Sequence, residues 1–550
     1  MNRKMRAFTA GAVGAILAFG LAELVHGIYD LVPSVFLAIA QGIIELTPGG
    51  FATQAIETLG SADIPVLIAS TVVGSLVVAG LLGVLSLRSR LAALLGVAGL
   101  GAIALVAAFT EPFIAPIPAI LTILSALGLG AWFADYLIRT SDLRTDAPSK
   151  KEAAPAQDAP AAEAPREAPT MDVRYKEAHS NRGIAVPRKN FLALGGAAAV
   201  VGLAAAGTGR ALSGGAAQET AAATPIKVGS TGGAVTHATL PPPPAAASIE
   251  VAGMPPLMTP NEDFYLIDTA LSSPRINVDR WKLSVKGAVE NPVSFTYEDL
   301  LGMPTRESDV TLSCVSNEVG GGLVSNARWT GVLLSDVLKE AGVGRGNVGR
   351  ASEQLVGRSA DGWTGGFKTG LALDGRDALV AFGMNGSELP VEHGYPARLV
   401  VPGVYGYVSA TKWLTEIELT DWDFDAYWIQ RTWAKEGPVK TQSRIDTVED
   451  GAVLEAGPIP VGGVAWAPHK GIERVEVSTD GGETWNEARL AAQLDPDTWR
   501  QYVYEWDAKP GEHAIKVRAT DGEGETQTAK PTPPHPSGAT GYHTIRVTVA

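Results

Sequence analysis

The chain has 550 residues, enough for about three or four units of ordinary domain size. Its formal net charge of -14 argues against nucleic-acid binding, because nucleic-acid phosphates require a basic protein surface. The single cysteine excludes intramolecular disulfides, four-cysteine iron–sulfur clusters and CxxCH haem attachment. Hydrophobic residues make up 46% of the chain and are concentrated before residue 210, so we expect a membrane part followed by a soluble part.

Residues 1–139 are predicted to form a transmembrane helical region. Four apolar segments there are close to the ~20 residues that cross a bilayer. They are Phe8–Val25, Ile64–Leu87, Leu91–Phe109 and Ile117–Ile138. A shorter segment, Leu31–Ile44, contains Pro33 and could be re-entrant or interfacial.

Basic residues indicate how these segments are oriented. Lys and Arg lie before the first span, between the second and third, and after the fourth, whereas residues 27–63 and 110–118 contain none. By the positive-inside rule the basic loops are cytoplasmic and the other two are outside, which requires that Leu31–Ile44 does not cross. Only His26 lies near a span, so we interpret the bundle as an anchor, with a quinone contact or a partner subunit as the weaker alternative.

Residues 140–187 are rich in Ala, Pro and Glu and are predicted to be a cytoplasmic linker. Residues 188–210 then contain a last transmembrane helix, which returns the chain to the outside. It begins with Arg188-Lys189-Asn190-Phe191-Leu192, which resembles a degenerate twin-arginine export signal, although ordinary basic flanking of a helix is the alternative. Residues 211–250 are predicted to be an extracellular linker.

The soluble part has mixed α/β character. Residues 281–287 alternate like a strand, and Tyr297–Leu301 and Leu334–Leu338 have the spacing of short helices, each following a Thr or Ser that could cap it. A further strand leads through Val310–Ser313 to Cys314 and a glycine-rich loop. A thiolate there suits a redox metal, but a lone cysteine is more often a small buried apolar residue.

Segments that follow Cys314 in the sequence favour the metal-ligand interpretation of this cysteine over the buried apolar one. Cys314 followed by Ala327-Arg328-Trp329-Thr330-Gly331 resembles the cysteine segment of the sulfite oxidase and assimilatory nitrate reductase family. Residues 389–398, Pro402-Gly403 and Lys412-Trp413-Leu414 are similar to the most specific signature of that family. The chain thus resembles a bacterial, membrane-anchored member of this molybdopterin-dependent family.

This resemblance implies a molybdenum–molybdopterin cofactor and a catalytic domain over residues 251–423. Cys314 would be the metal ligand. The other implied cofactor-binding residues are Asp263, Phe264, Tyr265, Ser359, His393, Arg398, Ser409, Ala410 and Lys412. Arg398 offers a planar fork for phosphate and His393 can donate or accept a hydrogen bond; without a cofactor, these two would be a surface ion-pair partner and a turn residue.

Residues 424–550 resemble the dimerisation domain of the family, an all-β immunoglobulin-like sandwich that implies a homodimer. Alternating strands over Ile472–Ser478, Ala514–Gly522 and Thr544–Val549, with a turn at Asp480-Gly481-Gly482, agree with this, although an extracellular adhesive module would look similar. The expected fold is therefore an α-helical membrane anchor, an α+β molybdopterin domain and a β-sandwich.

The resemblance implies oxygen-atom transfer in a two-electron step outside the cytoplasm, with electrons exchanged with a quinone or a cytochrome. Where sulfite oxidases place arginines for their dianion, this chain has Ile267, Val319 and Gly538-Ala539-Thr540; Arg358 or Lys368 could compensate. The substrate is therefore expected to be a small oxyanion or an S- or N-oxide. The alternatives are a methionine sulfoxide reductase of the same family and an envelope binding protein that has lost the cofactor.

Overall fold

The structure, a computed structural model, describes residues 2–29, 31–47, 63–110, 114–142, 188–220, 237–344 and 346–550. Most of the predicted linker 140–187 and part of the linker 211–250 lie outside these residues. The chain divides into two compact units: a helical unit within residues 1–213 and a mainly β unit that includes residues 214–550.

Five helices in the described part of the chain are long and apolar enough to cross a membrane. They are α1 (Arg3–Ile28), α4 (Asp63–Ser86), α5 (Arg90–Thr110), α6 (Pro116–Asp142) and α7 (Arg188–Thr220). Each coincides with an apolar segment predicted to span the membrane. By contrast, α2 (Val35–Leu46) has only 12 residues, which at about 1.5 Å per residue do not cover a hydrocarbon core of ~30 Å.

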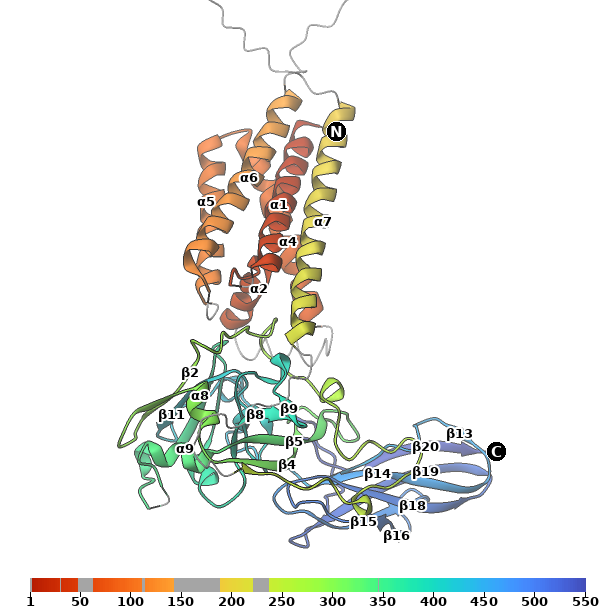
Figure 1. Cartoon of the computed structure of the whole chain (residues 1–550). Helices are drawn as coiled ribbons and strands as arrows, with labels where there is room; N and C mark the ends of the chain where they lie inside the picture. Colours follow the sequence, from red (N-terminus) through yellow and green to blue (C-terminus); the bar gives the residue numbers. More distant parts are fainter. Residues whose placement is uncertain are drawn as a thin grey trace, which may run out of the picture. The chain divides into compact units, whose positions relative to one another are not determined.

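Glycines bring α1 into close contact with three other helices of this unit, and α1 runs between α6 and α7 in Figure 1. A Cβ atom added to Gly11, Gly20 or Gly27 would lie 2.2 Å from a backbone oxygen of the facing helix, and one added to Gly14 would lie 2.5 Å away. The facing residues are Ala79 of α4, Gly130 of α6, and Gly202 and Gly209 of α7. Only glycine permits so close an approach of two helix backbones, and such small-residue contacts are typical of helices that pack within a membrane.

Two sheets form the first part of the β unit, residues 237–420, hereafter the mixed domain (Figure 1). The first sheet has the order β1-β4-β5-β8-β10, with β9 paired to β8, and the second has the order β3-β2-β11-β6-β7. The strands of the first sheet are β1 (His237–Ala238), β4 (Thr305–Ser313), β5 (Val324–Leu333), β8 (Leu379–Met384), β9 (Ser387–Glu388) and β10 (Arg398–Val400). Those of the second are β2 (Lys282–Gly287), β3 (Val293–Thr296), β6 (Gln354–Ser359), β7 (Thr364–Lys368) and β11 (Leu414–Thr420).

The two sheets of the mixed domain share one apolar core. Val285 of β2 and Ile417 of β11 belong to the same buried cluster as Phe382 of β8 and Leu399 of β10. Helix α8 (Tyr297–Leu301) begins as predicted with a threonine cap, because Thr296 accepts from Asp299 N and Asp299 in turn accepts from Thr296 N. The predicted cap of α9 (Leu334–Glu340) is wrong, since its N-cap residue is Leu333, which has no side-chain acceptor.

The C-terminal part of the β unit, residues 442–549, consists of two further sheets around a second core, hereafter the C-terminal sandwich. One sheet has the order β12-β14-β18-β17 and the other β13-β20-β19-β15-β16. The strands are β12 (Gln442–Ile445), β13 (Val453–Leu454), β14 (Gly457–Trp466), β15 (Ile472–Ser478), β16 (Asn486–Glu487), β17 (Arg489–Leu490), β18 (Arg500–Ala508), β19 (Gly511–Asp521) and β20 (His543–Val549). The β-rich character predicted for this part of the chain is confirmed.

Replacing Gly202 by Leu is expected to force α1 and α7 apart, because its Cβ would lie 2.6 Å from Ile16 O. We expect a loss of about 1–3 kcal/mol, as for other overpacked contacts, seen as a lower thermal midpoint of the protein in mild detergent. Gly207→Leu on the same helix is the control, since a Cβ at Gly207 would meet nothing within 4 Å. Equal effects of the two changes would contradict this account of the bundle.

Candidate active site

Cys314 lies at the start of the loop 314–323 that joins β4 to β5. Pairing of the two strands ends at Ser313 and Val324, and Cys314 N then donates to Leu323 O at 3.0 Å. The thiol Sγ lies 2.9 Å from Ser316 Oγ. Burial raises the pKa of Cys314 above its ordinary value, with the contacts to Ser316 acting in the opposite direction. The sulfur lines a cavity of about 840 Å³.

His393 and Arg398 line the same cavity and come from the segment that leads into β10. Between them the chain turns at Gly394, which has a φ of 112°. A Cβ on Gly394 would lie 2.9 Å from Lys412 Cβ and 3.2 Å from Arg398 Cβ. Both the backbone angle and the lack of space therefore require glycine here.

Arg398 is a buried cation, and the carboxylate that acts on its charge, Asp268, is itself paired with Lys412. Only 5% of the residue is exposed, and its guanidinium donates to His393 O at 3.0 Å and stacks 5.0 Å from the ring centre of Trp329. It forms no ion pair with any carboxylate that the structure describes. Burial lowers the pKa of Arg398 to about 10, so the group stays charged at neutral pH. A buried charge of this kind is stable only with a partner anion.

Lys412 and His393 are already engaged within the protein. Lys412 Nζ pairs with Asp268 and donates to Glu392 O at 2.7 Å. Burial lowers the pKa of His393 to about 4, so its imidazole is neutral at physiological pH. The Nε2 atom lies 2.8 Å from Asn261 O, and a neutral ring must donate there because a carbonyl only accepts.

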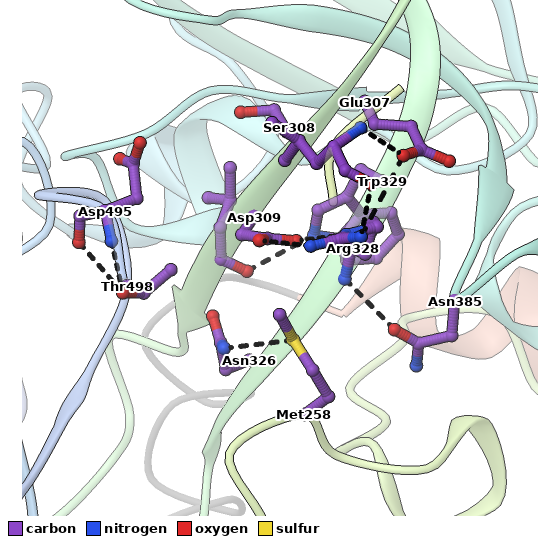
Figure 2. Close-up of polar contacts among 12 residues, drawn as sticks. Met258, Glu307, Ser308, Asp309, Asn326, Arg328, Trp329, Asn385, Asp495 and Thr498 are labelled. Atoms are coloured by element: carbon purple, nitrogen blue, oxygen red, sulfur yellow. Dashed lines mark hydrogen bonds and ion pairs between the residues drawn. The ribbon is translucent and has the colours of Figure 1, made fainter. Parts of the chain in front are cut away.

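A polar network joins β4 to β5 and to Asn385 (Figure 2). Arg328 of β5 donates from Nε and Nη2 to the carboxylate of Asp309 of β4, at 2.8 and 2.9 Å. Its backbone N donates to Asn385 Oδ1 at 3.0 Å, and Asn385 Nδ2 donates to Asn261 Oδ1 at 2.8 Å. Because Asn261 also accepts from His393, the network connects β4 and β5 to the imidazole.

Most of the predicted site residues meet at the cavity. Its lining includes Cys314, Phe264, Tyr265, Ser359, His393, Arg398, Ala410 and Lys412. Asp263 and Ser409 are not part of that lining: Asp263 is exposed, and the buried hydroxyl of Ser409 donates to Tyr405 O at 3.0 Å. A backbone contact of these two residues with a cofactor stays a prediction.

Neither cation proposed to compensate for the missing arginines lines the cavity. Arg358 pairs with Glu416 at 3.1 Å and also with Glu418. Lys368 pairs with Glu436. Both charges are balanced by carboxylates of neighbouring segments, so the suggested compensation is wrong.

Sequence reasoning missed the aromatic wall of the cavity, which Trp363, Tyr407, Trp428 and Trp433 contribute. It also missed the C-terminal residues 533–535, whose His535 Nε2 lies 3.1 Å from Thr432 Oγ1. The abundance of tryptophan in the soluble part was the only available signal. Which tryptophans face the cavity depends on contacts between distant segments, which no local pattern records.

Comparison with known proteins supports a common origin for this part of the chain. Residues 270–428 match the oxidoreductase molybdopterin binding domain, and residues 435–533 match the Mo-co oxidoreductase dimerisation domain. Mitochondrial sulfite oxidase of Mus musculus is 32% identical over 292 residues, which are 46% of this chain and 53% of that protein. NADH nitrate reductase 1 of Arabidopsis thaliana is 28% identical over 280 residues, 42% of this chain and 30% of that protein.

Among solved structures, the sulfane dehydrogenase SoxCD from Paracoccus pantotrophus is 26% identical with a TM-score of 0.47, and the match covers 55% of this chain and 83% of that chain. The chain spans about half the length of the sulfite oxidases that it matches.

The residues present fit the cofactor of these relatives. The only thiol of the chain and a buried, unbalanced guanidinium line one cavity large enough for a substantial ligand. A thiolate is a suitable ligand for molybdenum and a guanidinium fork is suited to a phosphate. Residues 270–428 and 435–533 are therefore the molybdopterin-binding and dimerisation domains of a molybdenum oxidoreductase of the sulfite oxidase type, and the match indicates a molybdenum–molybdopterin cofactor.

Proposed function

We propose that the chain is a membrane-anchored molybdopterin-dependent oxidoreductase that catalyses oxygen-atom transfer on a small molecule outside the cytoplasm. The observation that carries this proposal is the shared cavity of Cys314 and Arg398. An envelope binding protein that had lost the cofactor would be expected to fill or collapse this space. The open volume of about 840 Å³ therefore supports an enzyme over that alternative.

Each group has a distinct part in holding the cofactor. The Cys314 thiolate would bind the metal, and the Ser316 hydroxyl, at 2.9 Å, would donate to its sulfur. Arg398 would bind the pterin phosphate, since its charge has no carboxylate partner in the described structure. When bound, the cofactor supplies exchange of one oxygen atom with substrate and two electrons. Neutral His393, oriented by Asn261 O, would shape the pocket without adding charge.

The remaining lining of the cavity favours an organic S-oxide or N-oxide over an inorganic dianion. Once Arg398 holds the phosphate and Lys412 is paired with Asp268, the lining offers no further Lys or Arg. It offers the carboxylates of Glu318 and Asp361 instead, together with the aromatic wall of tryptophans and Tyr407. Aromatic faces bind apolar or cationic groups and give a dianion no hydrogen-bond donors in place of its water.

In the reductive direction, such a substrate loses its oxygen to become a sulfide or an amine. Two electrons from a carrier and two protons convert that oxygen to water. A methionine sulfoxide side chain, with an uncharged S-oxide and a terminal methyl group, fits the aromatic wall. We infer that electrons arrive from a quinone or a cytochrome.

The dimerisation domain supports a homodimer. We further infer that the C-terminal sandwich is immunoglobulin-like, because its four- and five-stranded sheets enclose a single core.

Substrate turnover by the purified protein tests the substrate class. With a reduced viologen dye as electron donor, we expect methionine sulfoxide and an aryl methyl sulfoxide to be reduced. With ferricyanide as acceptor, kcat/KM for sulfite oxidation should be at least ~100-fold lower than kcat/KM for S-oxide reduction. This is the effect expected when about two charged hydrogen bonds to the sulfite dianion are absent. Efficient sulfite oxidation with no S-oxide or N-oxide reduction would overturn this assignment.

We infer the topology from the five long apolar helices of the described residues, which make an odd number of crossings if each spans the membrane. The basic residues before α1 favour a cytoplasmic N-terminus, which would place residues 237–550 outside. Because this cofactor is inserted in the cytoplasm in the family, the domain would have to cross the membrane folded. Arg188-Lys189 at the start of α7 is then interpreted as part of a twin-arginine-type signal.

A reporter fused after Val549 should be active only outside the cell. Replacing Arg188 and Lys189 together by Gln should leave the fused domain in the cytoplasm, whereas replacing Arg88 and Arg90 in the loop before α5 should not. Normal export of the Arg188/Lys189 variant would refute the signal, and a reporter active only inside would refute the topology.

A further inference from the structure

The loop that carries Cys314 is held from outside the mixed domain by the C-terminal sandwich. Arg444, in β12, donates from Nη1 to Gly321 O at 2.8 Å. This bond joins two residues that are more than a hundred positions apart in the sequence. It satisfies a carbonyl near the end of the loop 314–323, where strand pairing between β4 and β5 has ended.

His543, the first residue of β20, packs directly against the neighbouring glycine. A Cβ added to Gly320 would lie 2.2 Å from His543 Cδ2 and 2.4 Å from His543 Nε2. The φ of 81° at Gly320 would also strain any other residue. The ring itself is fixed, because Ile445 N donates to His543 Nδ1 at 3.0 Å.

Contacts within the C-terminal sandwich hold the side chain and the backbone of Arg444 in place. Its Nε donates to Asp446 Oδ1 at 2.6 Å, and its own carbonyl accepts from Tyr502 Oη at 2.8 Å. Both side chains of the ion pair are largely buried, with 12% of Arg444 and 14% of Asp446 exposed. The guanidinium is thus a rigid part of the sandwich.

Hydrogen bonds within the loop hold its backbone together between the two glycines and Cys314. Gly321 N donates to Glu318 O at 2.9 Å, Leu323 N donates to Asn317 Oδ1 at 2.8 Å, and Cys314 N donates to Leu323 O at 3.0 Å. Restraint of Gly320 and Gly321 therefore restrains the whole loop, including the backbone from which Sγ projects.

We propose that Arg444 and His543 are positioning residues, through which the C-terminal sandwich holds the loop 314–323 and sets the orientation of the Cys314 sulfur toward the metal. The sandwich would then act on the metal ligand in addition to forming a dimer. The proposal depends on the proposed function only in taking Cys314 as the ligand.

Hydrogen–deuterium exchange of the loop amides in the full-length, cofactor-loaded protein in detergent tests this proposal. In Arg444→Met and in His543→Asn, amides of residues 314–323 should exchange about tenfold faster, the effect of losing one hydrogen bond or contact on a buried loop. His543→Asn retains an acceptor for Ile445 N and removes only the ring edge against Gly320, so it is expected to fold even if Arg444→Met does not.

Arg500→Met is the matched control. Arg500 also donates to backbone carbonyls of the sandwich, those of Ala491 and Ile472, at 2.7 Å each, without touching the loop. Unchanged loop exchange in His543→Asn, or an equal increase in Arg500→Met, would overturn the proposal.

A second measurement reads the sulfur–metal geometry. The electron paramagnetic resonance signal of the partly reduced metal should shift in Arg444→Met and His543→Asn and stay unchanged in Arg500→Met. An unshifted signal in both loop variants would contradict the positioning role. Absence of any metal from the wild-type protein would instead count against the proposed function, while loop exchange could still be compared.

Discussion

The buried guanidinium of Arg398 is the constraint on which the site depends. It lies beside His393 O and the face of Trp329 and forms no ion pair with a carboxylate of the described residues, since the nearby Asp268 is paired with Lys412. Removing such a charge from water costs several kcal/mol that its hydrogen bonds to the carbonyls of His393 and Leu399 do not recover. The structure around it is rigid, from the turn at Gly394 to the pairing of β10 with β8. An anion that binds in the cavity would stabilise the buried charge of Arg398, and a pterin phosphate is such an anion.

The thiol is the second fixed point, and it is positioned by parts of the chain that lie far apart in the sequence. β4 and β5 supply the loop, the network of Arg328 and Asn385 fixes the segment that orients His393, and the C-terminal sandwich contacts the loop at Gly320 and Gly321. The cavity also takes residues 533–535 from beyond the mixed domain. The site is thus built by the mixed domain and the C-terminal part together.

The sequence alone was sufficient to predict features that depend only on residues close together in the chain. The apolar spans, the strand leading to Cys314 and the threonine cap of α8 each depend on neighbouring residues, and the family signature around Arg398 lies within residues 389–414. The rest depends on tertiary contacts. Arg358 was available as a cation in sequence but is neutralised by Glu416 across the pairing of β6 with β11. Likewise, no periodicity could show that Trp428 and Trp433 would face the cavity or that Arg444 would reach Gly321.

The most direct test of the central claim is the molybdenum content of the purified chain. Protein from a cell able to make the cofactor should contain about one molybdenum and one pterin per chain, because the fold offers one thiolate and one cavity that unites it with Arg398. Cys314→Ser should lose most of the metal while remaining folded, since serine is similar in size. Wild-type protein without molybdenum, or a Cys314→Ser variant that retains all of it, would contradict the account.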